Sequence, residues 1–227
     1  KWHEDNNFKF NEKRNEKILY VIGESHTLVS HKLRINHLES NFLCKANLIK
    51  GCMQWHLGND KRNQYKAHFE RVFENLSRAS SVLLAIGEID CRLESGIIKH
   101  SANSLERRIN ETVIRTIDNF LTYVGELNCD PQHTITIQGV PCPNIDIAPY
   151  TENEIAKLTD TISFFNRQLK VKCQANGFGY LDVHTLTNRG DGFSNGSWHI
   201  DRIHLTAEGV SEAWREHYYP PNLGNIC

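Results

Sequence analysis

The chain has 227 residues, of which 39% are hydrophobic and 23% charged, and its formal net charge is −1. This composition is typical of a globular protein and excludes a fibrous or intrinsically disordered chain. Because the charge is nearly balanced, no overall field favours a polyanion, and we expect no nucleic acid partner. No apolar run reaches the roughly 20 residues that cross a bilayer, so we expect no membrane insertion.

The first sixteen residues, KWHEDNNFKFNEKRNE, are polar and charged. We predict a polar N-terminal extension over 1–16 and a single domain over 17–227. The chain begins at Lys1 without Met, so we expect a processed protein or part of a larger polypeptide. Seven cysteines are scattered without a CxxC pair, and an odd number cannot be fully bridged within one chain. Reduced thiols favour a cytoplasmic location, unless an upstream signal precedes the chain.

Short apolar segments rich in β-branched residues predict five buried strands along the chain. They are KILYVIG at Lys17–Gly23, ANLIKG from Ala46, SVLLAIG at 81–87, TITIQGV at 134–140 and YLDVH at 180–184. Their continuous apolar runs, without strict alternation, are typical of a sheet that is covered on both faces.

Segments with helical spacing separate these strands and follow the last one. They span residues 64–76, 104–127 and 152–174, and a final helix is predicted from a Thr206 cap to about Tyr218, before Pro220. Strand therefore alternates with helix, which predicts a parallel sheet with right-handed crossovers. The expected fold class is α/β, a three-layer α/β/α sandwich with about five parallel strands.

Chemically active residues are expected beyond the carboxyl ends of the strands, where open α/β sheets bind ligands. Ser25 follows the first predicted strand, and Asp201 and His204 precede the last helix. A serine hydroxyl becomes a nucleophile when a base removes its proton and a carboxylate orients that base. These residues could supply all three groups, although Ser25 could also cap a helix and Asp201 a turn.

Three sequence blocks lie at these positions: GESHTL at 23–28, GEID at 87–90 and Asp201-x-x-His204. They resemble, in the same order, the GDS-type, Gly-x-Asn-Asp and Asp-x-x-His blocks of the SGNH/GDSL hydrolases. The resemblance spans about residues 17–218. It implies a flavodoxin-like sandwich that hydrolyses esters or transfers acyl groups, with Ser25 as nucleophile, His204 as base and Asp201 as its orienter.

The resemblance also implies an oxyanion hole formed by the backbone N–H groups of Ser25 and Gly51. Two positions depart from the family pattern, because Glu24 stands for the usual Asp and Ile89 for the Asn that donates a side-chain hydrogen bond. We expect Arg92 to supply the missing donor, since a guanidinium suits anions, although it could instead only pair with Asp90 or Glu94.

Further residues around the predicted site have expected supporting roles. Glu24 and Asp90 would organise the loops around the nucleophile, while His26 and Trp198, with Trp55, would contact the substrate. His199-x-Asp201-x-x-His204 offers metal ligands, but this spacing is not a specific metal signature. We therefore expect no metal and no organic cofactor.

The sequence thus predicts a serine-dependent acyl-ester hydrolase that acts through an acyl-enzyme. GESHT together with GEIDCR also resembles a subgroup found beside sugar-modifying enzymes, which favours an acetylated carbohydrate over another small ester as substrate. The same triad would serve a carbohydrate O-acetyltransferase. A non-catalytic carbohydrate-binding module is the remaining alternative, and Ile89 is the main argument for it.

Overall fold

A seven-stranded sheet, ordered β2-β3-β1-β4-β5-β6-β7, forms the centre of the computed structural model. The structure describes residues 16–37, 40–101, 106–129 and 133–222, so the predicted extension up to residue 15 lies outside the described residues. Five neighbouring strands are parallel, as predicted: β3 (Ser40–Leu48), β1 (Lys17–Gly23), β4 (Ser81–Ala85), β5 (Thr134–Gln138) and β6 (Gly179–Leu181). The sequence did not predict the antiparallel edge strands β2 (Arg34–His37) and β7 (Tyr218–Tyr219).

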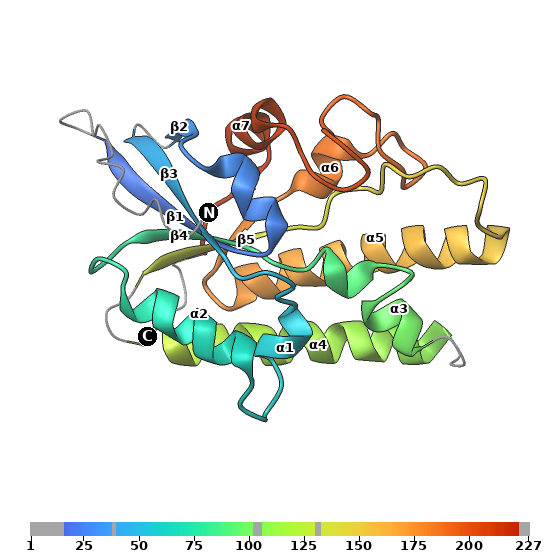
Figure 1. Cartoon of the computed structure of the whole chain (residues 1–227), viewed down its shortest axis with the longest axis horizontal. Coiled ribbons are helices and arrows are strands. Elements are labelled where there is room, and N and C mark those ends of the chain that lie inside the picture. Colours follow the sequence, from blue (N-terminus) through green and yellow to red (C-terminus); the bar gives the residue numbers. More distant parts are fainter. Residues whose placement is uncertain (1–15, 38–39, 102–105, 130–132, 223–227) are drawn as a thin grey trace.

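Helices cover both faces of the sheet, which confirms the three-layer sandwich (Figure 1). One face packs against α2 (Gln64–Glu74), α4 (Glu106–Leu127) and α5 (Glu152–Ala175). The other face is covered by the 3₁₀ helix η1 (Ser25–Ser30), α6 (Val183–Thr187) and α7 (Ala207–Glu216). Both faces of β1 are apolar, because Ile22 belongs to the first core and Val21 to the second. Among the described residues, no helix combines the length and the apolar character of a transmembrane span.

Short helices lie at the carboxyl edge of the sheet, where the loops connect. They are α1 (Gln54–Leu57), the 3₁₀ helix η2 (Ile89–Cys91) and α3 (Gly96–His100). The predicted fifth strand ends earlier than expected, because the Asp182 side chain accepts a hydrogen bond from the Thr185 N–H at 3.0 Å and starts α6. Thr206 caps α7 as predicted, accepting from the Gly209 N–H at 2.9 Å.

The end of β1 lies unusually close to β4. Gly23 has a φ of +152°, and a Cβ built on it would lie 2.2 Å from the carbonyl oxygen of Ala85. Its own carbonyl accepts a hydrogen bond from the Ile49 N–H at 2.6 Å, just beyond β3. Gly23 therefore ties three strand ends together, and only glycine fits there.

Replacing Gly23 by alanine should destabilise the protein by about 3 kcal/mol or more, because the new methyl group clashes with backbone and the φ is strained. Gly125→Ala is the matched control. Gly125 lies in α4, and a methyl group added there would meet no atom closer than 3.9 Å, so alanine should stabilise the helix by about 0.5–1 kcal/mol. Urea unfolding measures the change in the free energy of unfolding for both variants. Equal changes in the two variants would contradict the prediction for Gly23.

Candidate active site

Three side chains from opposite ends of the chain meet at the carboxyl edge of the sheet. Ser25 begins η1 directly after β1, whereas Asp201 and His204 lie in the loop before α7. Ser25 Oγ is 2.8 Å from Nε2 of His204, and Nδ1 of His204 is 2.7 Å from Oδ2 of Asp201. The structure therefore brings together the residues predicted as nucleophile, base and orienter, in that order.

Asp201 is held as an ionised carboxylate. Partial burial raises its pKa, but hydrogen bonds from the backbone N–H groups of His204 and Ile203, and from the His204 ring, lower it to about 2. Its Oδ1 accepts both backbone bonds at 2.8 Å, while Oδ2 faces the imidazole. One carboxylate thus fixes the turn and orients the ring, so the turn-capping role and the orienting role coincide.

Contacts from the loop after β5 hold the turn that carries Asp201. The Asn144 side chain donates to the carbonyl of Asp201 at 3.0 Å, and the Asn144 N–H donates to the carbonyl of Arg202 at 3.1 Å. A backbone bond of 2.8 Å from Ile200 to His204 closes the turn. The imidazole is therefore positioned by two loops, although Asn144 was not predicted as a site residue.

Glu24 is buried beside the serine. It is 1% exposed, and its Oε2 lies at hydrogen-bond distance, 3.2 Å, from Ser25 Oγ. Burial and the neighbouring Glu88 raise the pKa of Glu24 to about 8. Glu24, and not Ser25, precedes the first residue of η1, so the alternative that Ser25 caps this helix is wrong.

Asp90 connects two loops at the site. Its carboxyl group is fully buried and accepts hydrogen bonds from the N–H groups of Gln54 at 2.8 Å and Trp55 at 3.1 Å. Burial raises the pKa of Asp90 to about 7. Asp90 thus links η2 to the start of α1, the kind of organising contact that the sequence predicts.

Arg92 binds Glu88. Its Nε lies 2.9 and 2.8 Å from the two carboxyl oxygens, and Nη2 also contacts Oε2. The expected acidic partners, Asp90 and Glu94, are therefore not the ones it uses. No hydrogen bond joins Arg92 to Ser25 within the described residues, but Nη1 is not used by Glu88.

The two backbone donors predicted for the oxyanion lie on neighbouring strand exits. Gly51 follows β3 in a turn with a φ of +73°, and β3 pairs directly with β1. Among the described residues, neither the Ser25 N–H nor the Gly51 N–H donates a backbone hydrogen bond. Ile89 lies in η2 and has no donor in its side chain.

The structure buries His26, which was expected to contact the substrate, and packs Trp198 partly against the core. The His26 ring is 3% exposed, and its centroid is 5.0 Å from that of His204. Burial lowers the pKa of His26 to about 3, so the ring is neutral. Trp198 is half-buried and packs against the core under α7, where Gly209 lies against it. Trp55, which is 49% exposed, is the more accessible aromatic side chain.

One group of side chains has a spacing that could hold a metal ion. Ligand atoms of Glu24, His26 and Glu88 lie within 4.8 Å of one another, a cluster that the sequence did not suggest. Arg92 already binds both oxygens of Glu88, and its positive charge would repel a divalent cation. These residues therefore fit an ion pair better than a metal centre.

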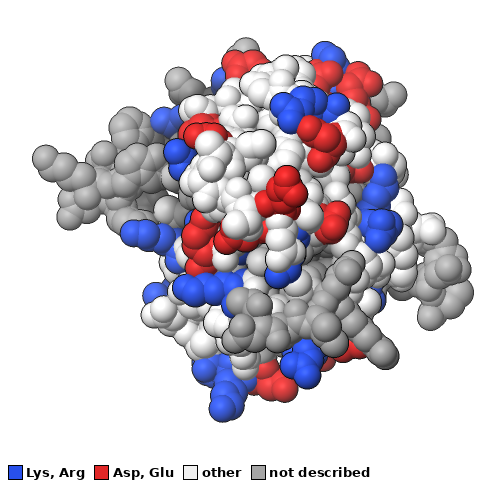
Figure 2. All heavy atoms as spheres, turned by 90° about the vertical axis from the view of Figure 1, so that its right-hand side faces the viewer, with Lys and Arg blue, Asp and Glu red and all other residues white. Residues whose placement is uncertain are grey.

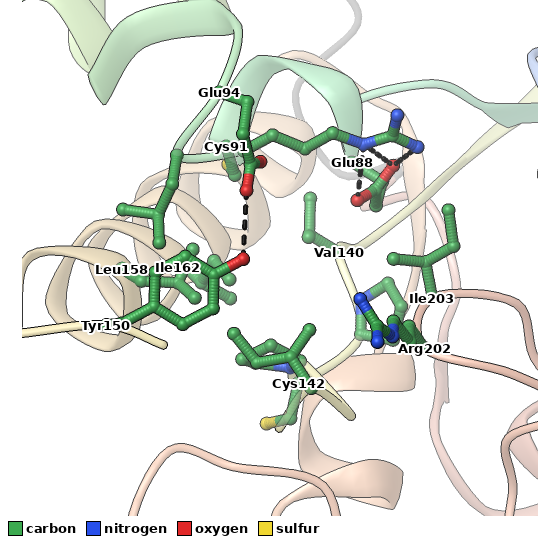
Figure 3. A pocket seen from close by; sticks show the side chains of 15 residues that line it. Glu88, Cys91, Glu94, Val140, Cys142, Tyr150, Leu158, Ile162, Arg202 and Ile203 are labelled. Carbon is green, nitrogen blue, oxygen red and sulfur yellow. Dashed lines mark hydrogen bonds and ion pairs between the residues drawn. The ribbon is translucent and has the colours of Figure 1, made fainter. Parts of the chain in front are cut away.

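A cavity of about 250 Å³ adjoins the loop of His204 (Figure 3). Val140, Leu158 and Ile162 form part of its apolar lining. Arg92 and Arg202 are among its polar lining residues, and Tyr150 donates to Glu94 at 3.0 Å across its rim. The sequence did not reveal this cavity, because its walls come from several loops and from α5, whose mutual packing only the fold determines.

Charges are mixed on the face of the molecule shown in Figure 2. Lys and Arg side chains alternate there with Asp and Glu, and neither sign gathers into one large patch. The described residues of this face therefore present no single-sign field to a ligand.

Asp90→Ala should lower the free energy of unfolding by about 2–4 kcal/mol, because it leaves two N–H groups at the start of α1 without their acceptor. Asp146→Ala is the matched control, since Asp146 also accepts from a backbone N–H, that of Ala148 at 3.0 Å, but is exposed. Asp146→Ala should lower the free energy of unfolding by less than about 0.5 kcal/mol. Comparable losses in urea unfolding would refute the organising role of Asp90.

Comparisons with known proteins identify the fold. No protein-family model and no curated protein matches the sequence. Among solved structures, a GDSL-like lipase from Bacteroides thetaiotaomicron aligns at a TM-score of 0.56 and 16% identity, over 88% of this chain and 85% of that chain. A tryptophan variant of the acetyl xylan esterase Axe2 from Geobacillus stearothermophilus aligns at a TM-score of 0.53 and 14% identity, over 87% of this chain and 92% of that chain. The acetyl xylan esterase AlAXEase aligns at a TM-score of 0.51 and 14% identity, over 87% of this chain and 96% of that chain. The chain therefore has the fold of the GDSL-type hydrolases, as its three sequence blocks predict.

Proposed function

We propose that this protein is a serine-dependent acyl-ester hydrolase that removes a short acyl group, typically acetyl, from a carbohydrate. The observation that carries the proposal is the continuous path of hydrogen bonds from Ser25 through His204 to Asp201, at 2.8 and 2.7 Å. A hydroxyl at this distance from an imidazole that a carboxylate orients is the arrangement needed to activate a serine.

The reaction follows from these contacts. Ser25 Oγ attacks the ester carbonyl carbon while Nε2 of His204 takes the serine proton, and the tetrahedral intermediate carries a negative oxygen. The intermediate collapses as His204 gives that proton to the departing alcohol, which leaves an acyl-serine. Water then attacks the acyl carbon as His204 takes its proton, and the second intermediate collapses as His204 returns that proton to Ser25 Oγ and the acid is released. Asp201, kept ionised, stabilises the imidazolium that forms in each half-reaction.

The negative oxygen would be bound by the N–H groups of Ser25 and Gly51, with Arg92 as the third donor. Both backbone groups are without a backbone acceptor in the described part of the chain, which supports this assignment. Glu88 holds Arg92 through Nε and Nη2, so Nη1 remains to donate. A guanidinium fixed in this way would replace the amide that Ile89 lacks.

The cavity beside His204 supports a carbohydrate as the alcohol half of the substrate. Its apolar lining and its polar rim of Arg202, Glu94 and Tyr150 suit a sugar ring, which has apolar faces and hydroxyl edges. Exposed Trp55 offers a flat surface near the loops of the site. Two of the structural neighbours are acetyl xylan esterases, which points to the same class of substrate.

Ser25→Ala should lower the rate of p-nitrophenyl acetate hydrolysis by at least about 10³-fold, because the nucleophile is lost. Ser30→Ala is the matched control: Ser30 lies buried in the same 3₁₀ helix and is expected to leave the rate near that of the wild type. Equal rates for Ser25→Ala and the wild type would rule out the serine mechanism. Acetyl found on an added oligosaccharide would instead identify a transferase.

Arg92→Gln should lower kcat by about 10²-fold with little change in KM, because the oxyanion exists only after attack. This substitution also leaves Glu88 without its cation. The double variant Arg92→Gln/Glu88→Gln removes that unpaired acid and should show the same loss of kcat. If the double variant recovers the wild-type rate, Arg92 serves only to neutralise Glu88 and is not an oxyanion donor.

A further inference from the structure

The Ser25 hydroxyl has two polar neighbours but a single proton. Nε2 of His204 lies 2.8 Å from Oγ, and Oε2 of Glu24 lies 3.2 Å from it. A hydroxyl can donate only one of these hydrogen bonds, while its lone pairs can accept the other. An ionised Glu24 can only accept, so it would compete with His204 for the serine proton. A protonated Glu24 can donate to Oγ and leaves that proton for His204.

We propose that Glu24 is a positioning residue that acts as a neutral carboxylic acid, donating a hydrogen bond to Ser25 Oγ and so directing the serine proton to His204. The inference rests on the proposed serine mechanism. It assigns to Glu24 a role in proton direction beyond organising the loops, and it requires the acid form of this side chain in the working enzyme.

The surroundings of Glu24 favour the acid form. The side chain is 1% exposed, so ionisation would place a charge out of contact with water. The acids Glu88 and Asp90 face it from the loop and 3₁₀ helix after β4, and both disfavour a further negative charge. These effects raise the pKa of Glu24 to about 8, chiefly through burial.

Nearby cations do little to offset this rise in the pKa of Glu24. Arg92 lowers the pKa of Glu24 only in part, since its guanidinium is bound to Glu88. His26 from η1 has its Nε2 3.9 Å from Oε1 of Glu24, but burial lowers its pKa to about 3 and keeps it neutral. His204 faces the serine from the loop before α7, and Asp201 lies behind its ring. At neutral pH, Glu24 is therefore mostly protonated.

The pH dependence of kcat/KM tests this role. The wild type should lose activity above about pH 8, approaching a tenfold fall per pH unit as Glu24 ionises. Glu24→Gln should abolish this alkaline fall, because its amide can still donate to Oγ but cannot ionise. Glu152→Gln, which alters an exposed acid in the first turn of α5, away from the site, should keep the fall. An alkaline fall that persists unchanged in Glu24→Gln would overturn the inference.

Unfolding as a function of pH measures the ionisation of Glu24 without reference to catalysis. The folded-state pKa is raised from 4.5 to about 8, so the unfolded chain releases this proton at lower pH than the folded one. The contribution of Glu24 to stability should therefore fall as pH rises from about 4.5 to 8. The Tm of Glu24→Gln, relative to wild type, should increase across that window.

The two measurements separate the inference from the function on which it rests. A relative Tm that does not change with pH would overturn the acid form of Glu24 and leave the serine mechanism intact. Wild-type activity in Ser25→Ala would instead overturn the serine mechanism, and with it the proton-directing role. If the relative Tm rises with pH and Glu24→Gln also loses the alkaline fall in activity, the results support both the inference and the serine mechanism.

Discussion

The close approach of β1 and β4 at Gly23 is the constraint on which the rest of the site depends. Because this residue has no side chain, the Glu24 N–H can donate to the carbonyl of Ala85 at 3.2 Å, and the Gly23 carbonyl can accept from Ile49. The chain segments that leave β3, β1 and β4 therefore start side by side. Ser25, Gly51 and the turn that holds Glu88 and Arg92 come from these three exits, so their proximity follows from the pairing of the strands.

Burial divides the carboxyl groups of the site into two kinds. Glu24 and Asp90 lie inside, where desolvation raises the pKa of each and a proton is retained at higher pH. Asp201 lies at the surface, where hydrogen bonds from its own turn keep it ionised. In the proposed mechanism, the buried acids organise the serine and the loops, and the exposed acid supplies the negative charge behind the histidine. Environment, more than residue type, sets these roles.

The sequence predicted those features that depend on local pattern. The continuous apolar run of β1 predicted both the strand and the exit of Ser25, and the Thr206 cap placed His204 directly before α7. Residues at strand exits and before helices meet at one edge of a parallel sheet, so their approximate meeting could be predicted without knowing the loops. The five parallel strands were predicted for the same reason.

Features that depend on packing between loops were not predictable from the sequence. Nothing in GEIDCR shows that Arg92 binds Glu88 and not Asp90, because both acids are near it in sequence and the 3₁₀ turn decides which one it faces. His26 is polar, yet the fold buries it. β2 contains Arg34 and Asn36 and β7 has two residues, so neither has the apolar run that identified the inner strands.

Labelling with a fluorophosphonate, followed by mass spectrometry of the digested protein, tests the central claim most directly. These reagents react with serines that a base has activated, whatever ester the enzyme naturally uses. A single adduct on the peptide that contains Ser25, absent in His204→Ala, is the predicted result. Folded protein that forms no adduct, or forms one on another residue, would contradict an activated Ser25.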